Sequence, residues 1–232
     1  MDARSLWEAM DGLGTNEDRL DEVILFRSGV ELRGVQAAYM SIYETDLIED
    51  LEDEVGGHAL AMYITALTEK VPHNEYETEN DVKYLYEAGE GRVGTDEETF
   101  ARVLGMSEPA HIEAMRELYQ RTHGKTFEEV IKSEFDSILD ESALKRCMLN
   151  ISMGYGNYIG KRLHKAMKGI GTDDGMLMRL LFSHRESGAL AGASAYLQAQ
   201  TGKTLIQWLR SECSGDYKKL MVAVAKAHGC DA

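Results

Sequence analysis

The feature that most constrains the fold is a short glycine-containing string that occurs three times in 232 residues. GLGTNED, VGTDEE and GIGTDDG stand at Gly12–Asp18, Val93–Glu98 and Gly169–Gly175. The glycines that precede the threonines are 80 and 77 residues apart. A nearly constant interval of this length indicates that one structural unit is built three times along the chain.

A helical spacing of apolar residues follows each string, as in Leu20, Val23 and Ile24 after the first. Patterns typical of strands are scarce. We therefore predict an all-α fold with three repeats of about five short helices each. The polar segment 71–81, which contains Pro72, is predicted to connect the repeats at 1–70 and 82–154, and the third repeat follows at 155–232.

Composition excludes several classes of protein. Acidic side chains outnumber basic ones 40 to 25, and the net charge of −15 argues against nucleic acid and against simple electrostatic docking on an anionic membrane. The three cysteines, Cys147, Cys213 and Cys230, suggest neither a disulfide framework nor a thiolate zinc site. With no apolar run long enough for a membrane span and no signal-peptide pattern, a cytoplasmic protein is expected.

The repeated string offers oxygen ligands. Glycine allows the backbone to turn carbonyl groups outward, and calcium takes six to eight oxygens from carbonyls, carboxylates and water. An acid stands 40, 40 and 41 residues after the three glycines, at Glu54, Glu134 and Glu212. Because 40 of the 232 residues are acidic, this spacing alone does not decide the matter. The plainer alternative is a tight turn before a helix capped by Thr15, Thr95 or Thr172.

These motifs resemble those of the annexin family along essentially the whole chain. The third unit, with MKGIGTDD at Met167–Asp174 and SECSGDYKK at Ser211–Lys219, is a close match to the family's calcium loop and its distal acid. MDGLGTNED at Met10–Asp18 is similar, and AGEGRVGTDEE at Ala88–Glu98 resembles the longer loop of the family's third repeat. Annexins ordinarily have four repeats, and the three found here resemble the second, third and fourth.

The resemblance implies three Ca²⁺ sites, each made of loop carbonyls and one distal carboxylate. The ligands carried over are Met10, Gly12, Gly14 and Glu54; Gly89, Arg92, Gly94 and Glu134; and Met167, Gly169, Gly171 and Glu212. Glu17, Glu97 and Asp174 are candidates for weaker accessory sites. The middle site departs most from the family pattern, because Phe135–Ile138 replaces a Ser-Gly turn.

The implied function is calcium-dependent binding to acidic phospholipid, with peripheral association to membranes when calcium rises. The alternative is a structural or interaction protein, cytoskeletal or self-assembling, that keeps the fold but has weakened or lost calcium and membrane binding. No paired acid and base or nucleophile constellation recurs, so an enzyme is not expected. An odd number of repeats leaves one apolar face without its usual partner, which leaves repacking, homo-oligomerisation and truncation open.

Three apolar residues, Leu13, Val93 and Ile170, stand at or beside the glycines of the loops. They suggest shallow insertion at a membrane interface, and packing against the following helix is the alternative. Trp7 and Trp208 are expected in the core. His111, His123 and His184 have no partner at metal or triad spacing, so they are expected to be surface or core residues without a catalytic role.

Overall fold

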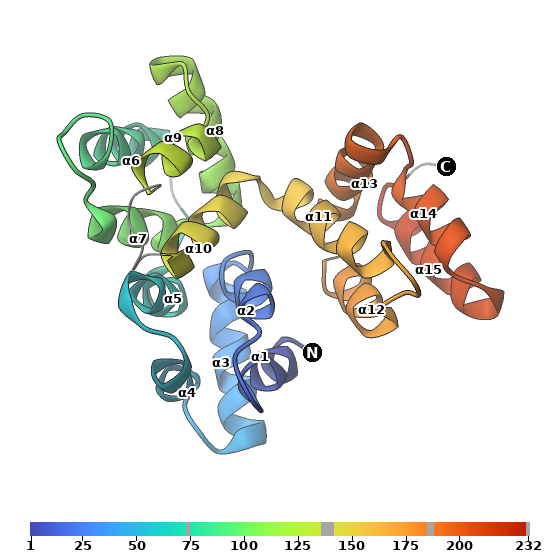
Figure 1. Ribbon diagram of the computed structural model, residues 1–232. Coiled ribbons are helices and arrows are strands. Elements are labelled where there is room, and N and C mark those ends of the chain that lie inside the picture. Colours follow the sequence, from blue (N-terminus) through green and yellow to red (C-terminus); the bar gives the residue numbers. More distant parts are fainter. Residues whose placement is uncertain (73–74, 136–141, 185–187, 231–232) are drawn as a thin grey trace. The chain divides into compact units, whose positions relative to one another are not determined.

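A computed structural model describes residues 1–72, 75–135, 142–184 and 188–230 (Figure 1). The described residues form fifteen helices and no strand. The helices are α1 Asp2–Met10, α2 Glu17–Ile24, α3 Gly29–Tyr43, α4 Leu47–Glu54, α5 Gly57–Glu69, α6 Glu75–Ala88, α7 Glu97–Met106, α8 Pro109–His123, α9 Phe127–Glu134, α10 Ser142–Ser152, α11 Tyr155–Met167, α12 Asp174–Ser183, α13 Ala189–Thr201, α14 Leu205–Glu212 and α15 Gly215–Ala227. Within this part of the chain no helix is both long and apolar enough to cross a bilayer.

The helices form three repeats of five, α1–α5, α6–α10 and α11–α15, which confirms the predicted fold class. The first two repeats make one compact unit, Asp2–Met153, and the third makes a second, Gly154–Ala232, to which Met1 is also assigned. The segment 71–81 differs from the expectation of a connector, because α6 already begins at Glu75.

Local sequence signals explain many of the helix starts. α3, α9 and α14 each begin with a capping box, in which Ser28, Thr126 and Thr204 exchange hydrogen bonds with the residue three positions later. Pro109 occupies the first turn of α8, as expected from the sequence. These caps satisfy backbone N–H groups that the first turn of a helix leaves without partners, so each of these helices begins at a defined residue.

The first and second repeats pack against each other through α5 and α7. At their contact Gly105 is required, since a Cβ there would lie 2.8 Å from the carbonyl oxygen of Met62. Close approach buries Met62 completely and leaves Val103 and Leu104 almost without exposure. The two repeats therefore share one apolar core along this contact.

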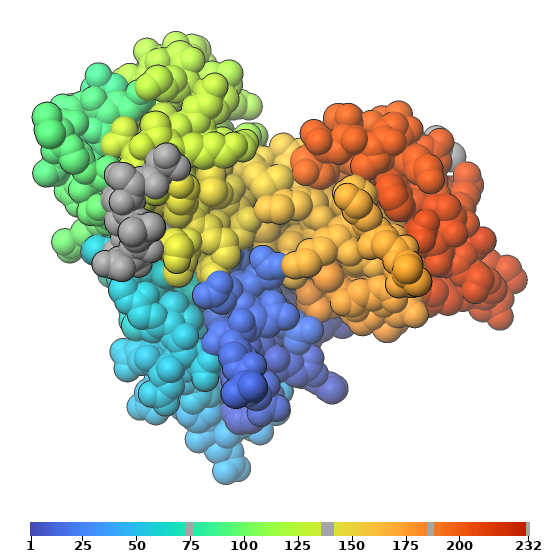
Figure 2. Space-filling view, viewed as in Figure 1, coloured from blue at the N-terminus to red at the C-terminus, as the bar shows by residue number. Residues whose placement is uncertain are grey.

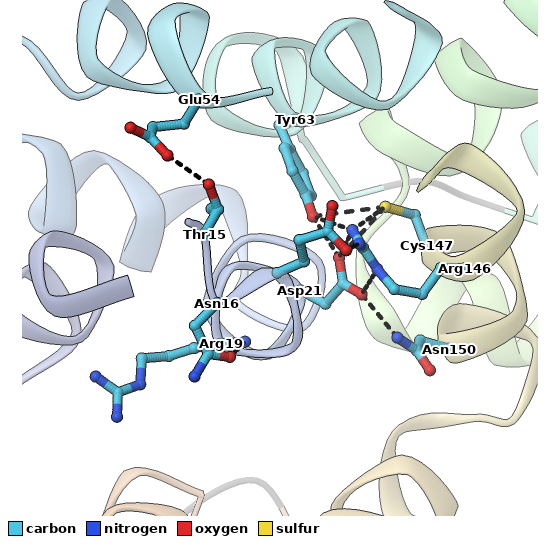
Figure 3. A network of polar contacts seen from close by, with 10 residues as sticks. Thr15, Asn16, Arg19, Asp21, Glu54, Tyr63, Arg146, Cys147 and Asn150 are labelled. Carbon is cyan, nitrogen blue, oxygen red and sulfur yellow. Dashed lines mark hydrogen bonds and ion pairs between the residues drawn. The ribbon is translucent and has the colours of Figure 1, made fainter. Parts of the chain in front are cut away.

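A buried polar network joins α2, α5 and α10 beside this core (Figure 3). Asp21 of α2 is fully buried, and its carboxylate accepts hydrogen bonds from Arg146 Nε at 3.0 Å and Asn150 Nδ2 at 2.7 Å. Tyr63 of α5 donates its hydroxyl to the same carboxylate, and burial raises the pKa of Tyr63. The buried charge of Asp21 is therefore paired and hydrogen-bonded, which is the condition under which burial of a carboxylate is tolerated.

A buried lysine closes the end of α2. Lys70 donates from Nζ to the carbonyl oxygens of Ile24 and Leu25, both at 3.0 Å, so it satisfies carbonyl groups that the helix terminus leaves without partners. Burial lowers the pKa of Lys70 to about 7, and the nearby charges of Glu108 and Glu31 act in the opposite direction.

In the third repeat the closest crossing is between α11 and α13. Gly156 faces Gly192, where an added Cβ would lie 2.8 Å from the opposite Cα, and Gly160 meets Tyr196 and Ala193. The helices of this repeat pack closely in the space-filling view (Figure 2). Leu163, Leu177, Leu197 and Leu209 are completely buried, so the repeat has a core of its own.

We expect Arg146→Met to lower the free energy of unfolding by about 3–5 kcal/mol, because Asp21 is then a buried charge without a cation. Adding Asp21→Asn to this variant should restore much of the loss, measured by denaturant unfolding. Lys132→Gln is the matched control, since it removes an exposed pair with Glu128 and should change stability little. Equal stability of Arg146→Met and wild type would contradict the role given to this pair.

Candidate metal centre

The loop between the first and second helices of each repeat is closed by the same backbone hydrogen bond. The N–H of the residue that caps the second helix donates to the carbonyl of an alanine in the last turn of the first helix. The three pairs are Asn16 and Ala9 at 2.7 Å, Asp96 and Ala88 at 2.8 Å, and Asp173 and Ala166 at 2.9 Å. The loops therefore share one closure although their sequences differ.

Glycines make the turn between these closed ends. Gly12 and Gly169 have φ values of 126° and 122°, which residues other than glycine rarely adopt. Gly14, Gly94 and Gly171 have φ values of 83°, 82° and 87°. Matching backbone conformations at matching positions confirm that the repeated string encodes one loop structure.

The closed loops leave backbone carbonyls without partners. Within the described part of the chain, the carbonyls predicted as ligands in the first and third loops accept no hydrogen bond. They belong to Met10, Gly12, Gly14, Met167, Gly169 and Gly171. In the middle loop, the carbonyl of Gly89 accepts the N–H of Arg92 at 3.0 Å, so one of its two lone pairs is already used. Unpartnered carbonyl oxygens in an exposed loop suit a hard cation such as calcium.

The three predicted acids occupy one structural position, the last residue of the fourth helix in each repeat: Glu54 in α4, Glu134 in α9 and Glu212 in α14. A helix C-terminus carries partial negative charge, so these carboxylates stand where a cation is favoured. Each of these helix ends lies beside the loop of its own repeat, which it contacts through a threonine hydroxyl.

Threonine hydroxyls connect each loop to its acid, and this differs from the expectation that they cap helices. The N-caps are the next residues, Asn16, Asp96 and Asp173. Thr15 instead donates to the carboxylate of Glu54 (Figure 3). Thr95 contacts the carboxylate of Glu134 at 3.1 Å, and Thr172 donates to the backbone carbonyl of Glu212 at 3.4 Å. Because the following Asn or Asp already provides the cap, the hydroxyl is available to hold the distal helix end.

The first loop borders an acidic cleft of about 210 Å³. Its lining residues are Trp7, Met10, Asp11, Gly12, Tyr39, Asp50, Asp53 and Glu54. Asp50 accepts hydrogen bonds from Tyr39 at 2.6 Å and from Thr45 at 3.0 Å, and burial together with Asp50 raises the pKa of Tyr39. Trp7, expected in the core, stacks on Tyr43 at 4.3 Å and forms one wall of this cleft.

The middle loop has an extra acid held by its own partners. Glu90 accepts a hydrogen bond from Tyr119 at 2.9 Å and pairs with Lys125. Burial works to raise the pKa of Glu90, but the hydrogen bonds from Lys125 and Tyr119 outweigh it and lower the pKa. Lys125 near the middle loop is thus neutralised by its ion pair with Glu90.

In the third loop, Glu212 accepts a hydrogen bond from Ser211 at 3.0 Å. Cys213, which follows it, is 5% exposed, and burial with the charges of Asp174 and Glu212 raises its pKa. A raised pKa keeps the thiol protonated, which supports a packing role rather than redox reactivity. The accessory candidate Glu17 forms an ion pair with Arg146, so its carboxylate is already engaged.

The three loop tips are fully exposed. Leu13, Val93 and Ile170 have relative exposures of 108%, 101% and 110%. Packing against the following helix, the alternative considered from the sequence, is therefore wrong. An apolar side chain with no contact in its own fold is available to an outside apolar phase.

The hydrogen-bond partners of a buried histidine are among the contacts that sequence reasoning missed. His111 is buried, with Nε2 at 2.9 Å from Asp81 and Nδ1 at 3.2 Å from Thr78. Since Thr78 is itself buried, no substrate can reach its hydroxyl. In the described residues no group of three or more His, Cys, Asp or Glu side chains could hold a metal ion without backbone oxygens.

The geometry matches known proteins. The family model named Annexin matches residues 1–65, 80–145 and 159–224. The chain belongs to the annexin family. Human Annexin A13 is 34% identical over 96% of this chain and 71% of its own length, and rat Annexin A6 is 32% identical over 95% of this chain and 33% of its own.

Solved annexin structures agree with this assignment. Annexin III has a TM-score of 0.82 at 28% identity and covers all of this chain, which spans 71% of it. The calcium-bound structure of annexin (Sm)1 has a TM-score of 0.79 at 25% identity over 97% of this chain and 68% of that one. A structure of this fold has thus been solved with calcium bound.

A glycine substitution tests the loop conformation. We expect Gly14→Ala to destabilise the protein by about 1–2 kcal/mol, because its φ is positive although nothing lies within 4 Å of an added Cβ. Gly34→Ala is the matched control: it has equal space within helix α3 and no positive φ, so it should stabilise by about 0.5–1 kcal/mol. Thermal unfolding of both variants measures the difference, and equal shifts would contradict it.

Proposed function

We propose that this annexin binds anionic phospholipid membranes in a calcium-dependent manner. The observation that carries the proposal is a set of unpartnered loop carbonyls beside a helix-terminal glutamate, found in the same form in the first and third repeats. The annexin family is known for this activity, and a structure similar to this chain is described as calcium-bound.

The proposed ligands are those carried over from the sequence. Met10, Gly12 and Gly14 with Glu54, and Met167, Gly169 and Gly171 with Glu212, would form the two better sites. Gly89, Arg92 and Gly94 with Glu134 would form a weaker one, because the N–H of Arg92 already bonds the carbonyl of Gly89. Thr15 and Thr95 would position the two glutamates through their hydrogen bonds.

Three carbonyls and one carboxylate fill only part of a calcium shell, which takes six to eight oxygens. When bound, the ion would supply positive charge and open positions for lipid phosphate oxygens. Because these loops provide few charges, binding without lipid should be weak, near the weak end of roughly 10⁻⁷ to 10⁻³ M. Lipid and calcium then raise each other's affinity by one factor, as linkage requires.

The exposed tips Leu13, Val93 and Ile170 would enter the interfacial region of the bilayer, where an apolar side chain is favoured over water. We infer a cytoplasmic protein that associates peripherally with membranes when calcium rises and that has no enzymatic activity. The alternative, a structural or interaction protein with weakened or lost membrane binding, is favoured by the weaker middle loop and by the count of three repeats.

We also propose a homo-oligomer, formed through the third repeat. Leu220 on α15 is 51% exposed and Met178 on α12 is 42% exposed. Counting from the distal glutamates, Leu220 corresponds to Met62 of the first repeat. Counting from the loop glycines, Met178 corresponds to Asp21 of the first repeat and Ala101 of the second. Met62, Asp21 and Ala101 are all buried where helices of the first two repeats meet. A second copy of the chain would cover the same face in the third repeat.

Glu54→Gln combined with Glu212→Gln should strongly reduce calcium-dependent sedimentation with vesicles of equal parts phosphatidylserine and phosphatidylcholine, because the two better sites each lose their only charged ligand and the weaker middle site alone remains. Wild type should sediment with calcium and be released by chelator. Glu79→Gln with Glu117→Gln is the control, since it makes the same charge change at exposed helical positions. Unchanged sedimentation of the first variant would show that the site residues are misassigned.

Wild type should be a dimer at tens of micromolar by light scattering, and Met178→Glu with Leu220→Glu should make it a monomer. Val30→Glu with Ile42→Glu changes two comparably exposed apolar residues, at 68% and 59%, and should leave the dimer intact. A monomeric wild type would rule out the proposed interface.

A further inference from the structure

The net charge of −15 is distributed very unevenly along the chain. Residues 1–153 hold 34 acidic and 14 basic side chains, whereas residues 154–232 hold 6 acidic and 11 basic. The first two repeats are thus strongly negative and the third is positive. An anionic surface repels the first unit and attracts the second, because screened Coulomb forces act over about 10 Å at 0.1 M salt.

The difference is concentrated next to the loops. Counting from the alanine that closes each loop, Lys165 corresponds to Glu8 and Glu87, and Lys168 corresponds to Asp11 and Glu90. Counting from the distal glutamate, Arg210 corresponds to Glu52 in the first repeat and to Lys132 in the second. Five of these six equivalents are acidic.

These basic residues lie at one end of the third repeat. Lys168 is the C-cap of α11 and is followed directly by the loop Gly169–Gly171. Arg210 is in the last turn of α14, whose final residue Glu212 accepts the hydroxyl of Thr172 from that loop. Lys218, in the first turns of α15, acts on the pKa of Cys213 and so lies near the same helix end. Lys168 and Arg210 are exposed, and Lys218 is half-buried.

An apolar tip lies in the loop that follows Lys168 directly. Ile170 is 110% exposed and lies two residues from Lys168 in the chain. Basic side chains around an exposed aliphatic residue suit a lipid interface, where phosphates and acyl chains lie close together. Nucleic acid offers the phosphates but gives no apolar phase to an isoleucine.

We propose that the third repeat makes the first contact with an anionic lipid surface and needs no calcium to do so, and that the first two repeats join only after calcium neutralises their loops. This proposal rests on the proposed function and adds the order in which the repeats contact the lipid surface. Once the third repeat is held, the other loops experience a raised effective concentration of lipid.

The test is sedimentation of the full chain, in chelator and at about 20 mM salt, with vesicles of equal parts phosphatidylserine and phosphatidylcholine. Wild type should partition measurably, and this should disappear at about 150 mM salt. Lys168→Gln with Arg210→Gln and Lys218→Gln should reduce partition on the order of 100-fold, at roughly fivefold for each basic side chain. Ile170→Asn should reduce calcium-free partition less than the triple variant does. With calcium present, it should reduce sedimentation at both salt concentrations.

The matched control is Arg33→Gln with Lys83→Gln and Arg121→Gln, three exposed basic residues of the first unit. It changes the net charge by the same amount and should alter calcium-free partition less than about threefold. Equal losses in the two triple variants, or no calcium-free partition of wild type, would overturn the proposal. So would displacement from the vesicles by a single-stranded oligonucleotide at equal phosphate concentration.

A calcium arm at about 150 mM salt separates this proposal from the proposed function. Calcium-dependent sedimentation at about 150 mM salt, with no calcium-free partition at about 20 mM salt, would overturn the order of contact and leave the function intact. Calcium-free partition without any gain from calcium would support the basic surface and contradict the calcium-dependent function.

Discussion

Each repeat depends on one backbone hydrogen bond, from the cap of its second helix to an alanine carbonyl in its first. In the first repeat Asn16 donates to Ala9, which forces the chain between them to reverse within a few residues. Only glycine takes the positive φ values that this reversal requires, as at Gly12 and Gly14. The carbonyls between the two bonded ends cannot reach a partner, and the loop remains stable because water solvates them.

The proposed ligand set would therefore be a consequence of how the loop closes and would not require a dedicated cluster of acids. One carboxylate arrives from a distant helix end, and a threonine hydroxyl that the cap does not need holds it there. Where the closure has an extra residue, as between Ala88 and Asp96, an internal bond from Arg92 to Gly89 takes up one of the carbonyls. A one-residue change in loop length thus alters the number of free oxygens.

Sequence reasoning reached the features that repeat and missed those that do not. Helical periodicity, the loop glycines and the placement of Glu54, Glu134 and Glu212 all recur, so each copy supports the others. The pair of Asp21 and Arg146 does not recur, and its members are separated by 125 residues. The threonines were misplaced by one position because Thr, Asn and Asp are all good caps, and only the fold decides which of two neighbours takes that role.

Total charge would be a poor guide to the proposed membrane contact, because the acids and bases are separated between the two units. At the first loop, Asp11, Asp53 and Glu54 line one cleft. A cation bound there would offset the repulsion between these carboxylates and an anionic lipid surface. At the third loop, the positive charges of Lys168 and Arg210 already offset the negative charge of Glu212. The same cation would add to an existing attraction between this loop and an anionic lipid surface. If the proposed sites bind calcium, loops with the same closure would respond to different calcium concentrations, since the surrounding side chains set the electrostatic work of bringing each loop to lipid.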